Sequence, residues 1–193
     1  MPFDLNLKID LNNYKISNLF KLNSIINEFI KSSLLYNKNI SINVLTNIKS
    51  RIKDKIFHDA KIKFKILNGK INFDHSIFIN KNIGLIEVDN SDLFLKNDRL
   101  ILTADLTLEI KDTDKLFSFL NTNKKSRKDI KNIKFNIIYD FLSNQIEFKK
   151  IKISDKEVSD QFKNIVEGFS DNNFNNLNKS RRLLNELIDI YEG

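Results

Sequence analysis

The 193-residue chain contains no cysteine and no tryptophan, a single proline and only four glycines. Without cysteine it forms no disulfide, no thiolate metal site and no thiol nucleophile. Because glycine is scarce, tight turns have to rely on asparagine and aspartate, which tolerate left-handed backbone conformations. No apolar run reaches the roughly 18 residues of a membrane-spanning helix, and the first ten residues, MPFDLNLKID, do not have the pattern of a signal peptide.

The chain is basic, with 32 lysine and arginine residues against 25 aspartate and glutamate residues and a net charge of +7. Such a charge is compatible with nucleic-acid binding. Only five of these residues are arginine, however, the side chain best suited to bidentate contacts with phosphate and guanine. Asparagine, isoleucine and lysine, which have AT-rich codons, together exceed a third of the chain. The composition therefore favours solvated lysines and predicts no nucleic-acid partner.

The most regular stretch is RLILTADLTLEI, at residues 99–110. Apolar residues occupy every second position in it. Because successive side chains of a strand point to opposite faces, this alternation predicts a strand with one dry face. Twelve residues at about 3.3 Å each give a strand of roughly 40 Å, about twice the usual length. The function therefore depends on what covers the dry face.

Similar one-sided alternation predicts further strands along the chain. It occurs at residues 3–11, 40–44, 61–67, 70–79, 85–95, 133–139 and 146–153. In the last of these runs the parity changes at Lys149-Lys150. A β-bulge at this point would return Ile151 and Ile153 to the same face as the apolar residues before them.

A hairpin is predicted inside this series at Asn68-Gly69, a dipeptide that favours two-residue turns. After this turn Ile77 and Ile79 are expected to continue the alternation of the second strand. Consecutive strands joined by short turns imply an antiparallel meander. The sequence therefore predicts an α+β fold, with a long twisted antiparallel sheet and amphipathic helices near the amino terminus, in mid-chain and at the carboxyl terminus.

Apolar residues at intervals of three and four predict helices at residues 17–35, 112–121, 155–169 and 179–191. Asp112 or Thr113 is expected to cap the mid-chain helix by accepting hydrogen bonds from its first N–H groups. This pattern divides the chain into a sheet domain at residues 1–153, with two inserted helices, and a helical segment at residues 154–193 that packs on the sheet. Because alternation starts directly after Met1, the chain is also expected to be a fragment of a longer protein.

No constellation of catalytic or metal-ligating residues stands out. The two histidines, His58 and His75, each lie beside an aspartate, but neighbours on a strand point to opposite faces, so both are interpreted as ordinary surface or strand residues. Residues 171–182 and 88–94 resemble calcium loops only in part, and both are interpreted as turns. The sequence therefore predicts no catalytic residue, no metal site and no cofactor.

The remaining candidate site is the apolar side of the sheet. Two interpretations are open: the helices cover it as an ordinary core, or it is an incompletely covered groove that holds acyl chains. If it is a groove, the candidate lipid-facing residues are Ile71, Phe73, Leu93, Leu95, Leu100, Leu102, Ala104, Leu106, Leu108, Ile110, Ile133, Phe135 and Ile137.

Two segments resemble the carboxy-terminal region of AsmA-like proteins. They are GKINFDHSIFIN at residues 69–80 and VDNSDLFLKNDRLILTADLTLEIKDTDKLFSFL at residues 88–120. Their order is a G-x-I-x-F strand, a second strand, a turn, and a long alternating strand that leads into an aspartate-capped helix. Residues 133–148 and 175–193 are also similar to this group, so the resemblance covers about residues 60–193.

The resemblance implies an envelope protein of Gram-negative bacteria. Members of the superfamily are anchored in the inner membrane by an amino-terminal helix, extend into the periplasm, and form long sheets with an apolar groove for phospholipid. The leading hypothesis is therefore a non-enzymatic, periplasmic domain that contributes to phospholipid transfer or outer-membrane assembly, with adjoining domains of a longer chain as partners and an anchor that this chain lacks. The alternative is a structural or protein-interaction domain with a fully covered sheet and no ligand.

Overall fold

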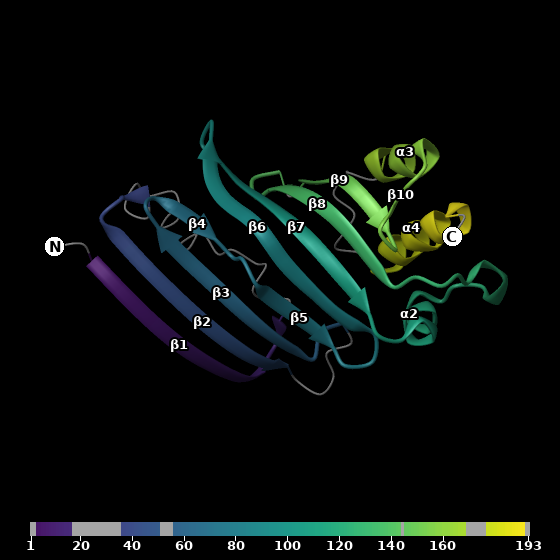
Figure 1. Ribbon diagram of the computed structural model, residues 1–193, viewed down its shortest axis with the longest axis horizontal. Coiled ribbons are helices and arrows are strands. Elements are labelled where there is room, and N and C mark those ends of the chain that lie inside the picture. Colours follow the sequence, from purple (N-terminus) through teal and green to yellow (C-terminus); the bar gives the residue numbers. More distant parts are fainter. Residues whose placement is uncertain (1–2, 17–35, 51–55, 144, 169–176, 192–193) are drawn as a thin grey trace.

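The computed structural model describes residues 3–16, 36–50, 56–143, 145–168 and 177–191, and these form one large curved sheet with helices at one end (Figure 1). The sheet has ten strands in the order β1-β2-β3-β4-β6-β7-β8-β9-β10, with β5 pairing with β3 and β6. The strands are β1 Phe3–Tyr14, β2 Ile40–Ser50, β3 Asp59–Leu67, β4 Lys70–Asn72, β5 Ser76–Asn80, β6 Gly84–Lys96, β7 Arg99–Ile110, β8 Asn132–Asp140, β9 Gln145–Ile153 and β10 Lys156–Glu157.

The predicted α+β class and the long, mainly antiparallel sheet are confirmed. Every strand pair from β2 to β10 is antiparallel, and β7 pairs with β6 on one side and β8 on the other. The exception is β1, which runs parallel to β2 with Phe3 opposite Ile40 and Asn12 opposite Lys49. Alternation within the strands assigns side chains to faces but does not fix strand direction, so the predicted meander did not include this parallel pair.

One face of the sheet is apolar. We define the apolar face as the side that carries the even-numbered residues of β7, from Leu100 to Ile110, together with their cross-strand partners. Leu93 and Tyr139, for example, flank Leu102. The opposite side, which carries Asp105 and the other odd-numbered residues of β7, is the polar face. Side chains of directly paired residues share a face, so the pairing extends both faces across the sheet.

Two β-bulges keep the apolar residues on one side. In β9, Lys150 and Ile151 lie opposite the single residue Phe135, and Lys150 has a left-handed φ of 50°. This confirms the predicted bulge, which places Ile151 and Ile153 on the apolar face. A second bulge lies in β6, where Asn90 and Ser91 face Ala104 and Asn90 has a φ of 47°. The strand predicted at residues 85–95 is confirmed, but no bulge was predicted in it, because residues 88–94 were also interpreted as a turn.

The predicted hairpin turn at Asn68-Gly69 is confirmed, with φ values of 53° and 74° that fit a type I′ turn. The expected second strand is interrupted, however, because β4 ends at Asn72 and β5 begins at Ser76. His75 between them has a φ of 61°. The parity shifts there, so Phe78 faces the core with Ala60, and the expectation that Ile77 and Ile79 continue the apolar face was wrong.

The described helices are α2 Thr113–Leu120, α3 Asp160–Gly168 and α4 Leu177–Ile190, and a 3-10 turn, η3, lies at Lys124–Ser126. Asp112 caps α2 as predicted, because its side chain accepts a hydrogen bond from the Lys115 N–H at 2.9 Å. All three helices contribute to one buried cluster that includes Ile151 and Ile153 of β9. The helix expected at residues 17–35 lies outside the described residues.

Candidate functional site: the apolar sheet face

The thirteen predicted lipid-facing residues lie on the apolar face but differ in burial. Five are buried, with at most 7% of their surface exposed: Ile71, Leu93, Leu100, Ala104 and Ile137. The other eight are half-buried: Phe73, Leu95, Leu102, Leu106, Leu108, Ile110, Ile133 and Phe135. The buried five act as core residues within this chain. An external ligand on this face can therefore contact the half-buried residues. It can also contact apolar residues of β1 that were not among the predicted thirteen.

The structure groups these residues into three packed clusters. Ile71, Leu93 and Leu100 are buried together with Ile66 near the β6–β7 turn, where Leu95, Leu102 and Phe73 pack against them. Ala104 and Ile137 are buried with Val88 at the centre of the sheet, against Leu106 and Phe135 among others. Ile110 and Ile133 pack against the cluster formed by the helices. Leu108 lies between Ile86 and Ile133 in the strand pairing.

The helices cover the apolar face at the β9 end. Phe162 and Val166 of α3 and Leu187 of α4 are buried in the same cluster as Ile151 and Ile153. The Tyr191 hydroxyl donates a hydrogen bond to the Ile153 carbonyl at 3.3 Å. α4 also holds the end of α2, because the Asn185 side-chain amide donates to the Leu120 carbonyl at 2.9 Å. This end of the sheet is an ordinary packed core.

At the other end, the apolar residues of β1 remain exposed. Phe3 is 56% exposed, Leu7 45% and Ile9 39%. They alternate on one side of an edge strand. Their partners on β2 are only partly buried: Ile40, Val44 and Thr46. The sequence analysis recognised β1 as a one-sided strand but did not include these residues in the candidate site. The signal was available in the alternation at residues 3–11.

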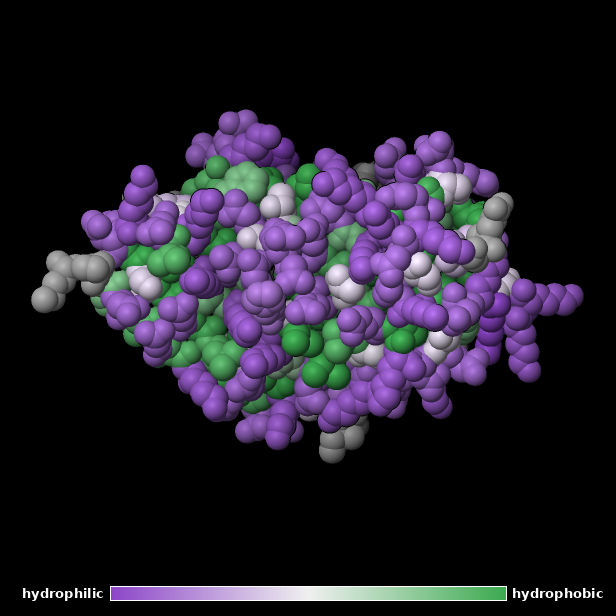
Figure 2. All heavy atoms as spheres, in the orientation of Figure 1, coloured by the Kyte–Doolittle hydropathy of each residue, from purple (hydrophilic) through white to green (hydrophobic). Residues whose placement is uncertain are grey.

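The polar face carries two depressions. One, of about 570 Å³, lies over β1 to β3, with Asn6, Lys8, Asn43, Lys63 and Lys65 among its lining residues. The other, of about 520 Å³, lies over β6 to β9 near the two bulges. In Figure 2 the side turned to the viewer is mainly hydrophilic, with hydrophobic residues visible between the polar ones toward β1 and β2. The strand pairing places the lysines of residues 61–65 on this polar face, opposite the apolar Ile62, Phe64 and Ile66.

Asp105 lies at the centre of the second depression and is held by both neighbouring strands. Its carboxylate accepts hydrogen bonds from the side-chain amides of Asn90 at 2.8 Å and Asn136 at 3.0 Å. These two hydrogen bonds lower the pKa of Asp105, the one from Asn90 most, while partial burial opposes them and the charge of Lys150 adds to them. The arrangement stabilises the bulge in β6.

The two histidines have different environments. His58 Nδ1 accepts a hydrogen bond from the Lys81 backbone N–H at 3.0 Å, which gives it a structural role in the loop before β3. His75 lies on the polar face, with its Nδ1 3.0 Å from Asp89 Oδ1. The partial calcium pattern at residues 88–94 forms the bulged part of β6, and the one at residues 171–182 lies largely outside the described residues.

The chain matches no protein-family model, no curated protein sequence and no solved structure. Among the described helices, none is long and apolar enough to cross a membrane. The functional interpretation therefore rests on the geometry of the sheet and on the resemblance described above.

Proposed function

We propose that the chain is a non-enzymatic lipid-binding domain whose apolar face contacts the acyl chains of phospholipid. The observation that carries the proposal is the exposed end of this face, at Phe3, Leu7 and Ile9. Among the described residues, helices cover the apolar face at β9 and leave these three side chains of β1 exposed, as expected of one segment of a longer apolar surface. Covering the exposed parts of these three side chains would contribute on the order of 3 kcal/mol.

The resemblance to AsmA-like proteins extends this proposal to a cellular role. In that role the domain contributes to phospholipid transfer or outer-membrane assembly in the periplasm, and its parent chain is held at the inner membrane by an anchor outside this sequence. Adjoining domains of the parent chain would then continue the apolar face past β1. Lipid, rather than a small polar substrate, is the ligand that matches a long and mainly apolar face.

Native mass spectrometry of the purified chain, followed by organic extraction, tests the proposal. We expect phospholipid in near-stoichiometric amount on the wild-type chain. Leu7→Lys and Ile9→Lys should each reduce it several-fold, because a charge on the apolar face has to be desolvated when acyl chains cover it. Both sites are exposed, so the variants should fold. Asn6→Lys is the matched control, since it adds the same charge to the polar face of the same strand.

A lipid-free, folded wild-type chain would contradict this function. An equal loss of lipid in Leu7→Lys and Asn6→Lys would also contradict it, because the effect would then follow net charge rather than the face. Circular dichroism of each variant distinguishes a loss of binding from a loss of fold.

The second candidate is a protein-interaction domain that pairs through β1, which is an edge strand in the described sheet. Edge strands present unpaired backbone groups that pair readily with another strand. The sequence of β1 is self-complementary in one antiparallel register, in which a second copy of the chain would bring unlike charges together and keep apolar residues on one face. In that register the pairs are Phe3 with Ile9, Asp4 with Lys8, Leu5 with Leu7, and Asn6 with Asn6.

Sedimentation equilibrium tests this candidate with a charge swap. Asp4→Lys places two lysines opposite each other and should weaken a dimer, and adding Lys8→Asp to it should restore the dimer. Both substitutions lie on the polar face, so lipid bound to the apolar face should be unaffected. A chain that stays monomeric at every concentration would rule out the second copy as the partner.

A further inference from the structure

Three potential metal ligands meet on the polar face, outside the apolar site. They are His75, in the link between β4 and β5, and Glu87 and Asp89, which stand two residues apart on β6. One donor atom from each side chain lies within 4.8 Å of the other two. In the sequence, the acidic neighbour of His75 is Asp74. The pairing of β5 with β6 brings His75 instead to these two carboxylates.

The spacing of His75 Nδ1 from each carboxylate fits a small transition-metal ion. Metal–ligand distances of about 2.1 Å and tetrahedral angles place two donors about 3.4 Å apart. His75 Nδ1 is 3.0 Å from Asp89 Oδ1 and 3.8 Å from Glu87 Oε1, so the two distances lie on either side of this value. Ca²⁺ would instead need six to eight oxygen ligands at longer distances, which an imidazole and two carboxylates do not supply.

The backbone around the cluster is fixed by hydrogen bonds. The His75 N–H donates to the carbonyl of Val88, the residue between the two carboxylates, at 2.7 Å. On the other side, Asp74 accepts hydrogen bonds from the N–H and the hydroxyl of Ser91 at 2.7 and 2.6 Å. The link between β4 and β5 is therefore joined to β6 at both Asp74 and His75. Side chains that project from a rigid frame lose less entropy when they bind an ion.

The charges in this region favour a cation. Asp89 lies directly opposite Asp105 in the pairing of β6 with β7, and like charges in this position repel. No lysine or arginine among the described residues forms an ion pair with Glu87 or Asp89, although the chain carries 32 basic residues. The side chains are 34% and 38% exposed, so an ion can enter from solvent. A bound cation would relieve the repulsion.

We propose that His75, Glu87 and Asp89 form a binding site for a divalent transition-metal ion such as Zn²⁺, Co²⁺ or Ni²⁺. His75 Nδ1 and one oxygen from each carboxylate are the protein ligands, and water completes the coordination. The site lies on the face opposite the proposed lipid surface. The test of this metal site is therefore independent of the test of the proposed function.

Isothermal titration calorimetry of the full, tag-free chain with Zn²⁺, Co²⁺ and Ni²⁺ tests the site. We expect one ion per chain, and His75→Asn should weaken binding by at least tenfold, on the order of the loss that even an outer-shell partner causes. Asparagine suits the left-handed backbone of residue 75, so this variant should fold. His58→Asn is the matched control, because it removes the chain's other imidazole, and its affinity should equal that of the wild type. Glu87→Gln should also weaken binding.

Three results would overturn the site. The first is no binding by the wild-type chain at millimolar ion. The second is equal affinity in His75→Asn and His58→Asn. The third is Ca²⁺ binding as tightly as Zn²⁺, which would show that the carboxylates act only as an acidic surface. The absorption spectrum of bound Co²⁺ gives a second readout, because it should change in Glu87→Gln and stay unchanged in His58→Asn.

Discussion

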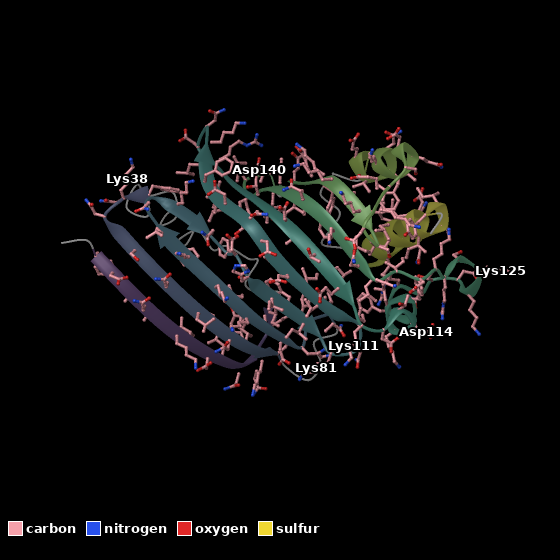
Figure 3. The ribbon with its side chains drawn as sticks, viewed as in Figure 1. Lys38, Lys81, Lys111, Asp114, Lys125 and Asp140 are labelled. Carbon is pink, nitrogen blue, oxygen red and sulfur yellow. The ribbon has the colours of Figure 1, made fainter. Side chains whose placement is uncertain are left out.

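Arg99 and Asp140 form an ion pair at the end of the β7–β8 pair, with Arg99 Nη2 2.5 Å from Asp140 Oδ2. The Asp140 side chain is only 12% exposed, and Figure 3 shows it at the upper edge of the sheet. Burial alone would raise the pKa of its carboxyl group. The N–H groups of Leu142 and Ser143 and the charge of Arg99 more than offset this, so the pKa lies below its usual value.

Asp140→Asn should lower the free energy of unfolding by about 1–3 kcal/mol at pH 7, because the ion pair with Arg99 is lost and the Leu142 and Ser143 N–H groups then donate to a neutral acceptor. A group with a depressed pKa stabilises the fold fully above its unfolded pKa of about 3.9 and loses this contribution as the pH falls through the folded value. The difference between wild type and variant should therefore shrink below about pH 4. Urea unfolding of both proteins at pH 7, 5 and 3 measures this difference in the free energy of unfolding.

The matched control for this pair is Asp114→Asn. Asp114 is 88% exposed and lies 3.6 Å from Arg127, so its loss should change stability by less than about 1 kcal/mol. Equal effects of the two substitutions on the free energy of unfolding would contradict this prediction. An Asp140→Asn effect that does not depend on pH would also contradict it, because the charge of Asp140 would then not stabilise the fold.

The bulge in β6 depends on a left-handed residue. Asn90, with a φ of 47°, donates a hydrogen bond to Asp105. Asn90→Gly keeps the backbone conformation but loses this bond, whereas Asn90→Val loses the bond and strains the backbone by a further 1–2 kcal/mol or so. We expect the valine variant to be the less stable of the two in urea unfolding. Equal stabilities would mean that the bulge relaxes when Asn90 is replaced.

A loss of the Asn90 hydrogen bond should also be visible at Asp105. Because this bond is the largest cause of the lowered pKa of Asp105, either Asn90 variant should raise that pKa toward its ordinary value. NMR of the Asp105 side-chain carboxyl carbon across a pH titration follows the change. An unchanged titration would assign the lowered pKa to Asn136 and Lys150 instead.

The two bulges show what the sequence could and could not predict. Both are visible as a change of parity: between Phe148 and Ile151 in β9, and between Val88 and Leu93 in β6. The first was predicted because apolar residues stand close on both sides of it. The second was not predicted because the residues between Val88 and Leu93 are polar. They resemble part of a calcium loop and were interpreted as a turn.

The remaining differences arise from long-range pairing. A long segment with a helical pattern separates the strands at 3–11 and 40–44, and such crossovers typically connect parallel strands, so the direction of β1 could have been inferred. The meeting of His75 with Glu87 and Asp89 could not. It depends on the register of β5 on β6 and on the left-handed backbone of His75. Neither of these can be predicted from the apolar alternation of the residues around His75.

Gly84 is the position where the sheet allows no side chain. Its φ is 153°, and an added Cβ would lie 1.9 Å from the carbonyl oxygen of Glu109. Gly84→Ala therefore has to displace the β7 backbone at the start of β6, and it should lower the free energy of unfolding by more than about 2 kcal/mol. Asn82→Ala, in the exposed turn just before, should stay within about 0.5 kcal/mol of wild type. Thermal unfolding measures both, and an unaffected Gly84→Ala would contradict this close approach.

The closure of the apolar face at β9 depends on the buried side of α4. Leu187 is 6% exposed within the helix cluster, while Leu184, one turn earlier, is 38% exposed. Leu187→Ala removes buried methyl groups and leaves a cavity, so it should cost about 2–5 kcal/mol. Leu184→Ala makes the same chemical change and should cost less than about 1 kcal/mol. Urea unfolding of the two variants gives the comparison.

The same pair of variants connects the packing of α4 to the proposed lipid binding. If α4 closes the face, loosening it with Leu187→Ala should expose Ile151 and Ile153 and increase the fluorescence of a bound hydrophobic dye well below the unfolding midpoint. Leu184→Ala should leave the fluorescence at the wild-type level. Equal fluorescence from both variants would mean that the β9 end stays closed without α4, and that the open part of the apolar face is confined to β1.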